Sequence, residues 1–330
     1  MADAAILSVR DLTMCYFTNA GVVRAVDEVS FDVDRGKTLG LVGESGCGKS
    51  AAALSIVGLV PPPGRIVSGQ IIFDGTDLAS LTERGMRAVR GRKIGFVFQD
   101  PMSSLNPTMP VGLQIAESAQ IHLRLSRRAA LSRAADLLGR VGIPRPRERM
   151  HDFPHQFSGG MRQRVMISMA LACEPSLLLA DEPTTALDVT IQAQILDLIR
   201  SLSAELGMAV VLITHDLGIA AGMCDSISVM YAGRIVEIAD VDTIFERPQM
   251  PYTRGLLASI PRPGVARRGH LETIEGAPPD LIDPDASCRF APRCRYVHDI
   301  CWAKEPALTP RQGAQFARCW GTEPGGWLNG

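Results

Sequence analysis

The feature that most constrains this 330-residue chain is a glycine-rich loop at residues 43–50, which reads Gly-Glu-Ser-Gly-Cys-Gly-Lys-Ser. It fits the pattern G-x-x-x-x-G-K-[ST], follows the apolar run Thr38–Val42 and precedes a helical stretch that continues to Leu59. In this setting glycines let backbone N–H groups wrap phosphates, and the helix N-terminus adds positive potential. The loop therefore predicts a nucleotide-phosphate site between a strand and a helix.

A second pattern supplies the acids that such a site needs. The apolar run Leu177–Ala180 ends in Asp181-Glu182, which is typical of a buried strand that delivers one carboxylate to Mg²⁺ and another to the attacking water. Lys49 is expected to reach the β- and γ-phosphates, and the Ser50 hydroxyl to bind Mg²⁺. The expected nucleotide contacts in the loop are Gly43, Ser45, Gly46, Cys47, Gly48, Lys49, Ser50 and Ala51.

Strand and helix patterns alternate along the rest of the chain. The first forty residues alternate apolar and polar, which predicts antiparallel strands joined at Asn19-Ala20-Gly21 and ended by Asp34-Arg35-Gly36. Further segments are buried strands at Lys93–Phe98 and Ala209–Thr214, a helical stretch from about Leu113 to Gly142, and a hairpin at Ser226–Ala239. This alternation predicts an α/β fold with a parallel sheet. The composition shifts to Pro, Gly and Cys after Arg247-Pro248, which predicts a boundary near residue 250.

Four further features resemble those of ABC ATPases. They are the signature-like Ser158-Gly159-Gly160-Met161-Arg162-Gln163-Arg164, which opens a helix through Cys173, the Q-loop glutamine Gln99, the D-loop-like Ala186-Leu187-Asp188, and the switch histidine His215. Their order with the loop and the acids is that of the family. Met161 and Phe157 depart from the residues found in many members, in a form that is usual in peptide-importer subunits.

The resemblance implies a P-loop NTPase core of the ABC type over residues 1–250, with an antiparallel β-subdomain and a helical subdomain at about 103–157. It implies that Glu182 is the general base, that His215 holds the γ-phosphate, and that Gln99 touches Mg²⁺ or water. Two such subunits would sandwich two ATP molecules, so the signature residues Ser158, Gly159 and Gly160, with Asp188, would complete a site in trans. Tyr16 is expected to stack on adenine, with Phe17 as the competing residue because a one-residue shift changes the face of the sheet.

Four cysteines crowd the expected C-terminal domain, residues 251–330, with the spacing Cys288-x5-Cys294-x6-Cys301-x17-Cys319. A reduced cytosolic chain with such a group favours a metal over disulfides, although four ordinary thiols remain an alternative. Zinc fits four thiolates, but the two C-x-x-C knuckles of zinc ribbons are missing. The segment resembles the C-terminal part of dipeptide- and oligopeptide-importer ATPases, some of which carry a [4Fe–4S] cluster. That resemblance favours the cluster, with zinc as the alternative.

Composition restricts the partners. The 34 Lys and Arg residues balance 35 Asp and Glu residues. The chain therefore has no net positive charge that would favour nucleic acid as a partner. We see no signal peptide, and the apolar runs are shorter than the roughly 20 residues that span a bilayer.

The resemblance implies an ATP-hydrolysing importer subunit at the cytoplasmic face of the cell membrane. Its partners would be two transmembrane permease subunits, a second ATP-binding subunit (a copy or a paralogue) and an extracytoplasmic substrate-binding protein. Di- and oligopeptides are the expected cargo, with nickel or another small solute as the alternative. A soluble ABC ATPase that acts on ribosomes or DNA is less favoured, because the chain has one nucleotide module and lacks sustained heptads.

Overall fold

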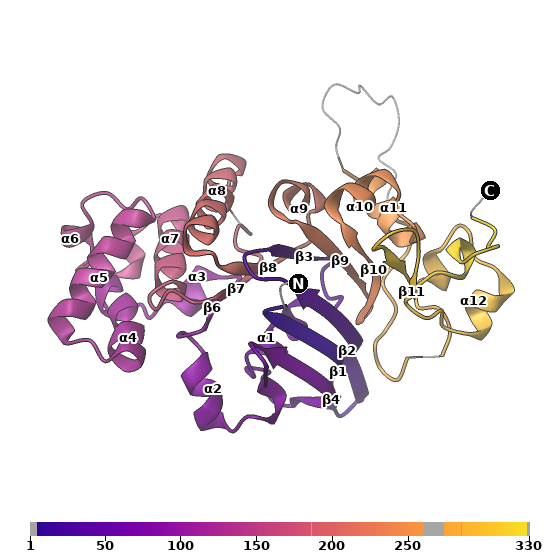
Figure 1. Ribbon diagram of the computed structural model, residues 1–330, viewed down its shortest axis with the longest axis horizontal. Helices are drawn as coiled ribbons and strands as arrows, with labels where there is room; N and C mark the ends of the chain where they lie inside the picture. Colours follow the sequence, from indigo (N-terminus) through magenta and orange to yellow (C-terminus); the bar gives the residue numbers. More distant parts are fainter. Residues whose placement is uncertain (1–4, 186, 261–273, 285, 329–330) are drawn as a thin grey trace. The chain divides into compact units, whose positions relative to one another are not determined.

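The computed structural model describes residues 5–185, 187–260, 274–284 and 286–328, and its chain divides into two compact units (Figure 1). Unit 1 comprises Met1–Ile6, Val33–Lys37 and Ser80–Ile213. Unit 2 comprises Leu7–Asp32, Thr38–Ala79 and Thr214–Gly330. Within the described residues, no helix is both long enough and apolar enough to cross a membrane.

Unit 1 contains three parallel strands, β6 (Ile94–Val97), β7 (Leu177–Asp181) and β8 (Ala209–Thr214). Every residue of β7 and β8 is buried, which explains why both read as continuous apolar runs rather than as alternating patterns. The register places Asp181 beside Ile213, so the carboxylate stands at the carboxyl end of the sheet. These strands confirm the parallel segments that the sequence predicts.

Helices make up most of the rest of unit 1. They are α2 (Glu83–Val89), α3 (Pro101–Ser104), α4 (Val111–Leu123), α5 (Arg127–Arg140), α6 (Pro146–Arg149), α7 (Gly159–Ala170) and α8 (Val189–Leu206), with a 3₁₀ turn η2 at Pro154–Gln156. Helices α4 and α5 pack against each other and against α7 (Figure 1). Ser126 caps α5 by accepting a hydrogen bond from the Ala129 N–H, which satisfies one donor of its first turn.

Unit 2 contains an antiparallel sheet with the order β2-β1-β4-β5. Its strands are β1 (Leu7–Thr18), β2 (Gly21–Val33), β4 (Gly64–Phe73) and β5 (Thr76–Asp77), followed by the 3₁₀ turn η1 (Leu78–Ser80). The turn between β1 and β2 lies where the sequence predicts it. The register of β1 on β4 runs from Leu7 opposite Phe73 to Tyr16 opposite Gly64.

A second set of strands in unit 2 joins the phosphate-loop strand to the C-terminal tail. Strand β3 (Thr38–Val42) runs parallel to β9 (Ser226–Tyr231), which forms a hairpin with β10 (Arg234–Asp240). The tail strands β12 (Phe316–Ala317) and β11 (Thr309–Pro310) continue the pairing beyond β10. The helical elements are α1 (Lys49–Ile56), α9 (Leu217–Met223), α10 (Val241–Glu246), α11 (Pro251–Ala258) and α12 (Asp299–Ala303), with 3₁₀ turns η3 (Ala291–Arg293) and η4 (Trp320–Thr322).

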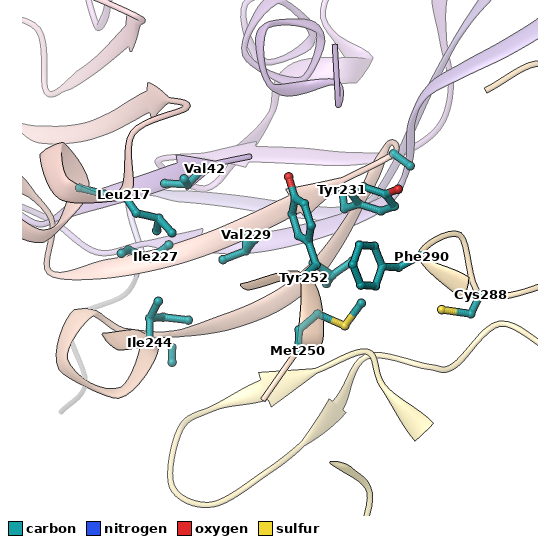
Figure 2. Close-up of a cluster of buried hydrophobic side chains, with 14 of the residues drawn as sticks. Val42, Leu217, Ile227, Val229, Tyr231, Ile244, Met250, Tyr252, Cys288 and Phe290 are labelled. Carbon is teal, nitrogen blue, oxygen red and sulfur yellow. The ribbon is translucent and has the colours of Figure 1, made fainter. Parts of the chain in front are cut away.

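One buried core of unit 2 spans both sides of residue 250 (Figure 2). Tyr231 of β9, Tyr252 of α11 and Phe290 pack ring against ring, with centroids 4.5–5.5 Å apart. Cys288 and Cys301 belong to the same core. The predicted boundary near residue 250 stays a prediction, and the core shows that the tail packs against the β9–β10 hairpin rather than standing apart from it.

Candidate nucleotide site

The phosphate loop of unit 2 has the backbone that its glycines predict. Gly46 and Gly48 have φ angles of 79° and 108°, in the left-handed region that other residues rarely adopt. A Cβ atom on Gly48 would lie 2.1 Å from the Ala25 carbonyl oxygen, so this loop position has no room for a side chain. Ser45 and Gly46 form the exposed tip, and α1 begins directly after the loop at Lys49.

Lys49 is buried and its ammonium group is held by the loop itself. Its Nζ donates to the carbonyl oxygens of Gly43 and Glu44 at 2.8 and 2.9 Å. The Cys47 sulfur lies 3.8 Å from the same nitrogen, and burial raises the pKa of this thiol despite the nearby charge. The loop therefore presents a positive charge together with its backbone N–H groups, and Cys47 remains a neutral thiol.

The predicted adenine and γ-phosphate residues also lie in unit 2. Tyr16 is half-buried and packs against Gly64, where a Cβ atom would come within 2.6 Å of the Tyr16 ring. The Phe17 ring is covered by the Arg65 guanidinium at 4.0 Å from the ring centroid. His215 is exposed directly after β8, ahead of helix α9. The choice of Tyr16 over Phe17 as the adenine residue stays a prediction.

The predicted catalytic acids and the predicted Q-loop glutamine come together in unit 1. Gln99 Nε2 donates to Glu182 Oε2 at 2.9 Å, and the Thr185 hydroxyl donates to the same oxygen at 2.8 Å. Glu182 has a φ of 43°, an uncommon conformation for a residue other than glycine, and it follows the buried Asp181 at the end of β7. Such outliers cluster at functional sites because the surrounding structure must hold them. Sequence reasoning missed Thr185, which no motif position marks.

The signature residues begin α7 in unit 1. The Ser158 side chain caps this helix by accepting a hydrogen bond from the Met161 N–H at 3.4 Å. Gly160 faces α8 so closely that a Cβ atom would lie 2.6 Å from Ile191 Cγ2. Asp188 in turn caps α8 by accepting from the Ile191 N–H at 3.0 Å, whereas Ala186 of the predicted D-loop lies outside the described residues. The signature and the D-loop aspartate are thus held on neighbouring helix starts.

The four tail cysteines, Cys288, Cys294, Cys301 and Cys319, line one small cavity in unit 2 together with Phe290, Trp320 and Trp327. All four are free thiols. Burial raises the pKa of Cys288 to about 12 and that of Cys294 to about 11, so these thiols are neutral at physiological pH in the metal-free protein. Among the residues that the structure describes, no group of three or more His, Cys, Asp or Glu side chains is placed to hold a metal ion. The predicted Cys-rich cluster domain is therefore not confirmed.

Comparisons with known protein families match two regions of the chain. Residues 26–185 match the ABC transporter family, and residues 236–301 match the family described as oligopeptide/dipeptide transporter, C-terminal region. The chain is 52% identical over 96% of its length, and 94% of the relative's, to a probable peptide ABC transporter ATP-binding protein of Sinorhizobium fredii. It is 49% identical over 97% of its length, and 89% of the relative's, to the oligopeptide transport ATP-binding protein OppD of Bacillus subtilis.

The folds of solved structures agree with these matches. The dimeric ABC transporter cassette MJ0796 aligns with a TM-score of 0.65 at 27% identity, over 71% of this chain and 98% of that one. A post-hydrolysis state of the same cassette, bound to ADP and Pi, aligns with the same TM-score. The ABC ATPase α/β fold expected from the sequence is therefore confirmed.

Proposed function

Since this chain belongs to the OppD/DppD family, the ATP-binding subunits of oligopeptide and dipeptide ABC transporters, we propose that its predicted site residues bind and hydrolyse ATP. The chain is the ATP-binding motor subunit of a peptide ABC importer. The observation that carries the catalytic proposal is the Glu182 carboxylate, whose Oε2 atom accepts from both Gln99 and Thr185.

The proposed reaction is phosphoryl transfer from ATP to water. A water oxygen forms a bond to the γ-phosphorus while the bond from that phosphorus to the β–γ bridging oxygen breaks, giving ADP and inorganic phosphate. Glu182 accepts a proton from the attacking water, and the hydrogen bonds from Gln99 and Thr185 orient its carboxylate. His215 binds the γ-phosphate. The protein thus supplies positioning and charge, with no covalent intermediate.

The loop residues bind the triphosphate in this proposal. Lys49 exchanges its contacts with the Gly43 and Glu44 carbonyl oxygens for phosphate oxygens, and the N–H groups from Ser45 to Ala51 donate to the same chain of phosphates. Tyr16 stacks on the adenine ring. Two observations support this binding mode. Lys49 is buried within the loop, and the positive φ angles of Gly46 and Gly48 give the loop the backbone conformation of a phosphate-binding loop.

Mg²⁺ is the metal that this family of reactions requires, and the predicted donors suit it chemically. The Ser50 hydroxyl, the Asp181 carboxylate and the Gln99 amide oxygen are hard oxygen ligands, which Mg²⁺ prefers together with phosphates and water. Asp181 is 6% exposed, so its carboxylate stands in a buried setting at a strand end. When bound, Mg²⁺ would neutralise charge on the β- and γ-phosphates.

The functional unit in this proposal is a dimer of ATP-binding subunits. The similar bacterial ABC transporter cassette MJ0796 is dimeric in its solved structure. Ser158, Gly159 and Gly160 at the start of α7, with Asp188, would then complete the site of the opposite subunit through a helix N-terminus aimed at its γ-phosphate. Two permease subunits and an extracytoplasmic binding protein complete the importer, with this chain at the cytoplasmic face. The similar ATP-binding proteins of peptide, oligopeptide and dipeptide transport favour peptides over nickel as cargo.

Reconstitution tests this proposal. The chain is assembled with its permeases in liposomes, with the binding protein added on the side opposite the ATP site. Peptide-dependent ATP hydrolysis and ATP-dependent uptake of labelled peptide are expected, and both should be lost in Lys49→Ala. Uptake that persists without ATP, or in the Lys49→Ala assembly, contradicts the proposal, and transport of nickel but not peptide would reassign the cargo.

We propose as a second point that the four tail cysteines hold a [4Fe–4S] cluster. The support is that all four line one cavity, that thiolates are the ligands of such clusters, and that aromatic side chains surround them. A single zinc ion bound by the same four thiolates is the alternative, and it would require four sulfurs at about 2.3 Å from one point. When bound, the cluster would cross-link the tail.

Colour and iron content test the cluster. Thiolate–iron charge transfer absorbs broadly near roughly 400 nm, whereas zinc is colourless, so protein purified without oxygen should be brown with about four irons per chain. Cys301→Ser should bleach it, and the matched change Cys224→Ser, at the cysteine that directly follows α9 and does not line this cavity, should not. Colourless protein with one zinc per chain would replace the cluster by zinc, and metal-free active protein would leave four ordinary thiols.

A further inference from the structure

We propose that Tyr252 and Arg293, two residues of the C-terminal region, are positioning residues for the phosphate loop, which they hold through Glu44. The inference rests on the proposed function, because it assumes that the loop binds ATP. Glu44 is the second residue of the glycine-rich loop, and its carboxylate accepts hydrogen bonds from Arg293. All of these residues belong to unit 2.

Arg293 forms a two-pronged ion pair with Glu44. Its Nη1 and Nη2 atoms lie 2.7 and 3.0 Å from the two carboxylate oxygens, and the Arg293 side chain is only 3% exposed. The same guanidinium donates to the Glu275 carbonyl oxygen at 3.0 Å and to the Tyr231 hydroxyl at 3.4 Å. The arginine is therefore held by the tail and by β9 as well as by the loop. Its planar guanidinium group can bond to both carboxylate oxygens at once.

Tyr252 holds the backbone of the same loop residue. It is fully buried on α11, and its hydroxyl accepts a hydrogen bond from the Glu44 N–H at 2.9 Å. Figure 2 shows Tyr252 beside Tyr231 and Phe290 in the shared core. The Glu44 carbonyl oxygen meanwhile accepts from Lys49 Nζ at 2.9 Å. The side chain, the N–H and the carbonyl group of one loop residue are thus all engaged, two of them by the tail.

This arrangement gives the C-terminal region a role in the nucleotide site. The ABC transporter match covers residues 26–185, and the C-terminal match covers residues 236–301, which include both Tyr252 and Arg293. Because the side chain, N–H and carbonyl group of Glu44 are all bonded, the loop is ordered before ATP binds. An ordered loop binds ATP more tightly, since it loses less conformational entropy on binding. The tail contacts touch none of the reacting atoms. Their loss should therefore weaken ATP binding while leaving the rate of the chemical step nearly unchanged.

The test measures ATP affinity and turnover separately. The full chain is titrated with a fluorescent ATP analogue, and kcat and KM are measured in the importer assembled with its permeases. Arg293→Met is expected to weaken binding and raise KM about tenfold, with kcat within about threefold of the unmodified protein. Arg293→Lys should recover only part of the affinity, since it keeps the charge but not the fork. Tyr252→Phe should raise KM by a few-fold.

Matched controls separate positioning from general stability. Arg311→Met removes an arginine that bonds only within the tail, to Thr309, Pro310, Cys319 and Thr322 among the described contacts, and should leave KM unchanged. Combining Arg293→Met with Glu44→Gln should weaken ATP binding little more than either change alone, because both remove the same contact. Circular dichroism checks that each variant is folded.

The inference is overturned if folded Arg293→Met has a normal KM, or if Arg311→Met loses as much ATP affinity as Arg293→Met. It is also overturned if the losses of ATP affinity in Arg293→Met and Glu44→Gln add up in the double variant. A fall in kcat with unchanged KM would also count against it. If the unmodified chain itself fails to bind ATP, the proposed function fails instead, and that result is distinct because it does not depend on any substitution in the tail.

Discussion

Gln99 and Glu182 lie 83 positions apart in the sequence, and a hydrogen bond of 2.9 Å joins the amide of one to the carboxylate of the other. Gln99 follows β6 and Glu182 follows β7, two parallel neighbours whose carboxyl ends meet at the same edge. Thr185 donates to the same Glu182 oxygen at 2.8 Å. The proposed base is therefore oriented by a residue that also stands where ABC ATPases have their Q-loop glutamine.

Gln99→Ala is expected to lower ATP turnover about tenfold or more. A hydrogen bond to a charged group is worth about 1.5–3 kcal/mol, and the variant leaves Glu182 with fewer groups that orient it. Steady-state ATPase assays of the assembled importer measure the effect. Gln194→Ala is the matched control. Gln194 is an exposed residue of α8, and its side chain accepts a hydrogen bond from Arg164 of α7. Equal activity of the two variants would argue against a role for Gln99.

Gly160→Ala is expected to destabilise the protein by about 1–3 kcal/mol, the usual cost of overpacking. The added methyl group would lie 2.6 Å from Ile191 Cγ2, and β-branched side chains cannot turn away easily. The double variant Gly160→Ala/Ile191→Ala should lack this clash. It should still lose the stability that the Ile191 side chain contributes by its packing. Urea unfolding measures both variants. Gly139→Ala, whose new methyl group would find only an ordinary contact at 3.6 Å, should not destabilise.

Asp27 gives the fold a specific pH dependence. Burial alone would raise the pKa of Asp27, but the charges of Arg234 and Arg289 outweigh it and hold that pKa below its usual range. A lowered folded-state pKa means that the stabilisation is complete above the unfolded value of about 3.9 and is lost as pH falls through the folded value.

Asp27→Asn should therefore cost about 3 kcal/mol at neutral pH, because it removes the negative charge that pairs with the largely buried Arg289 and Arg234, although Arg234 keeps its contact with Glu28 at 3.3 Å. That difference should shrink as pH falls below about 3.9, where the native carboxyl group also becomes protonated. The control is Asp32→Asn on the same strand: its pair with Arg10 is exposed, with side chains 51% and 42% accessible, and should contribute less than about 1 kcal/mol. Chemical unfolding between pH 2 and 7 measures the free energy of unfolding of both variants. Equal losses of stability in Asp27→Asn and Asp32→Asn would contradict the role given to Asp27.

Local patterns predicted the strands well because burial leaves a direct signal. Strands β3 and β8 have the bounds that their apolar runs predict, Thr38–Val42 and Ala209–Thr214. The sequence predicts a helical pattern from about Leu113 to Gly142, and the structure forms it as two helices, because Arg124 ends α4 with a φ of 55° and α5 begins at Arg127. Glycine usually marks such a left-handed end, so an arginine there gives no warning in the sequence.

The contacts that join distant segments could not be predicted in this way. Glu44 and Arg293 are 249 positions apart, and neither periodicity nor motif spacing encodes their pairing. The same holds for the core that brings Tyr231, Tyr252 and Phe290 together, since each segment alone shows only an aromatic residue near a turn or helix start. Motifs predict which residues bind the nucleotide, whereas packing between distant segments determines which contacts hold those residues in place.

The most direct test of the account is the turnover of Glu182→Gln in the assembled importer. The substitution keeps the shape of the side chain and leaves Asp181 and Lys49 in place, but an amide cannot accept the proton of the attacking water. The account predicts that ATP still binds with near-normal affinity while steady-state hydrolysis falls by about 10²–10⁴-fold, the usual contribution of a general base. Hydrolysis within a few-fold of the unmodified importer would contradict the central role of Glu182.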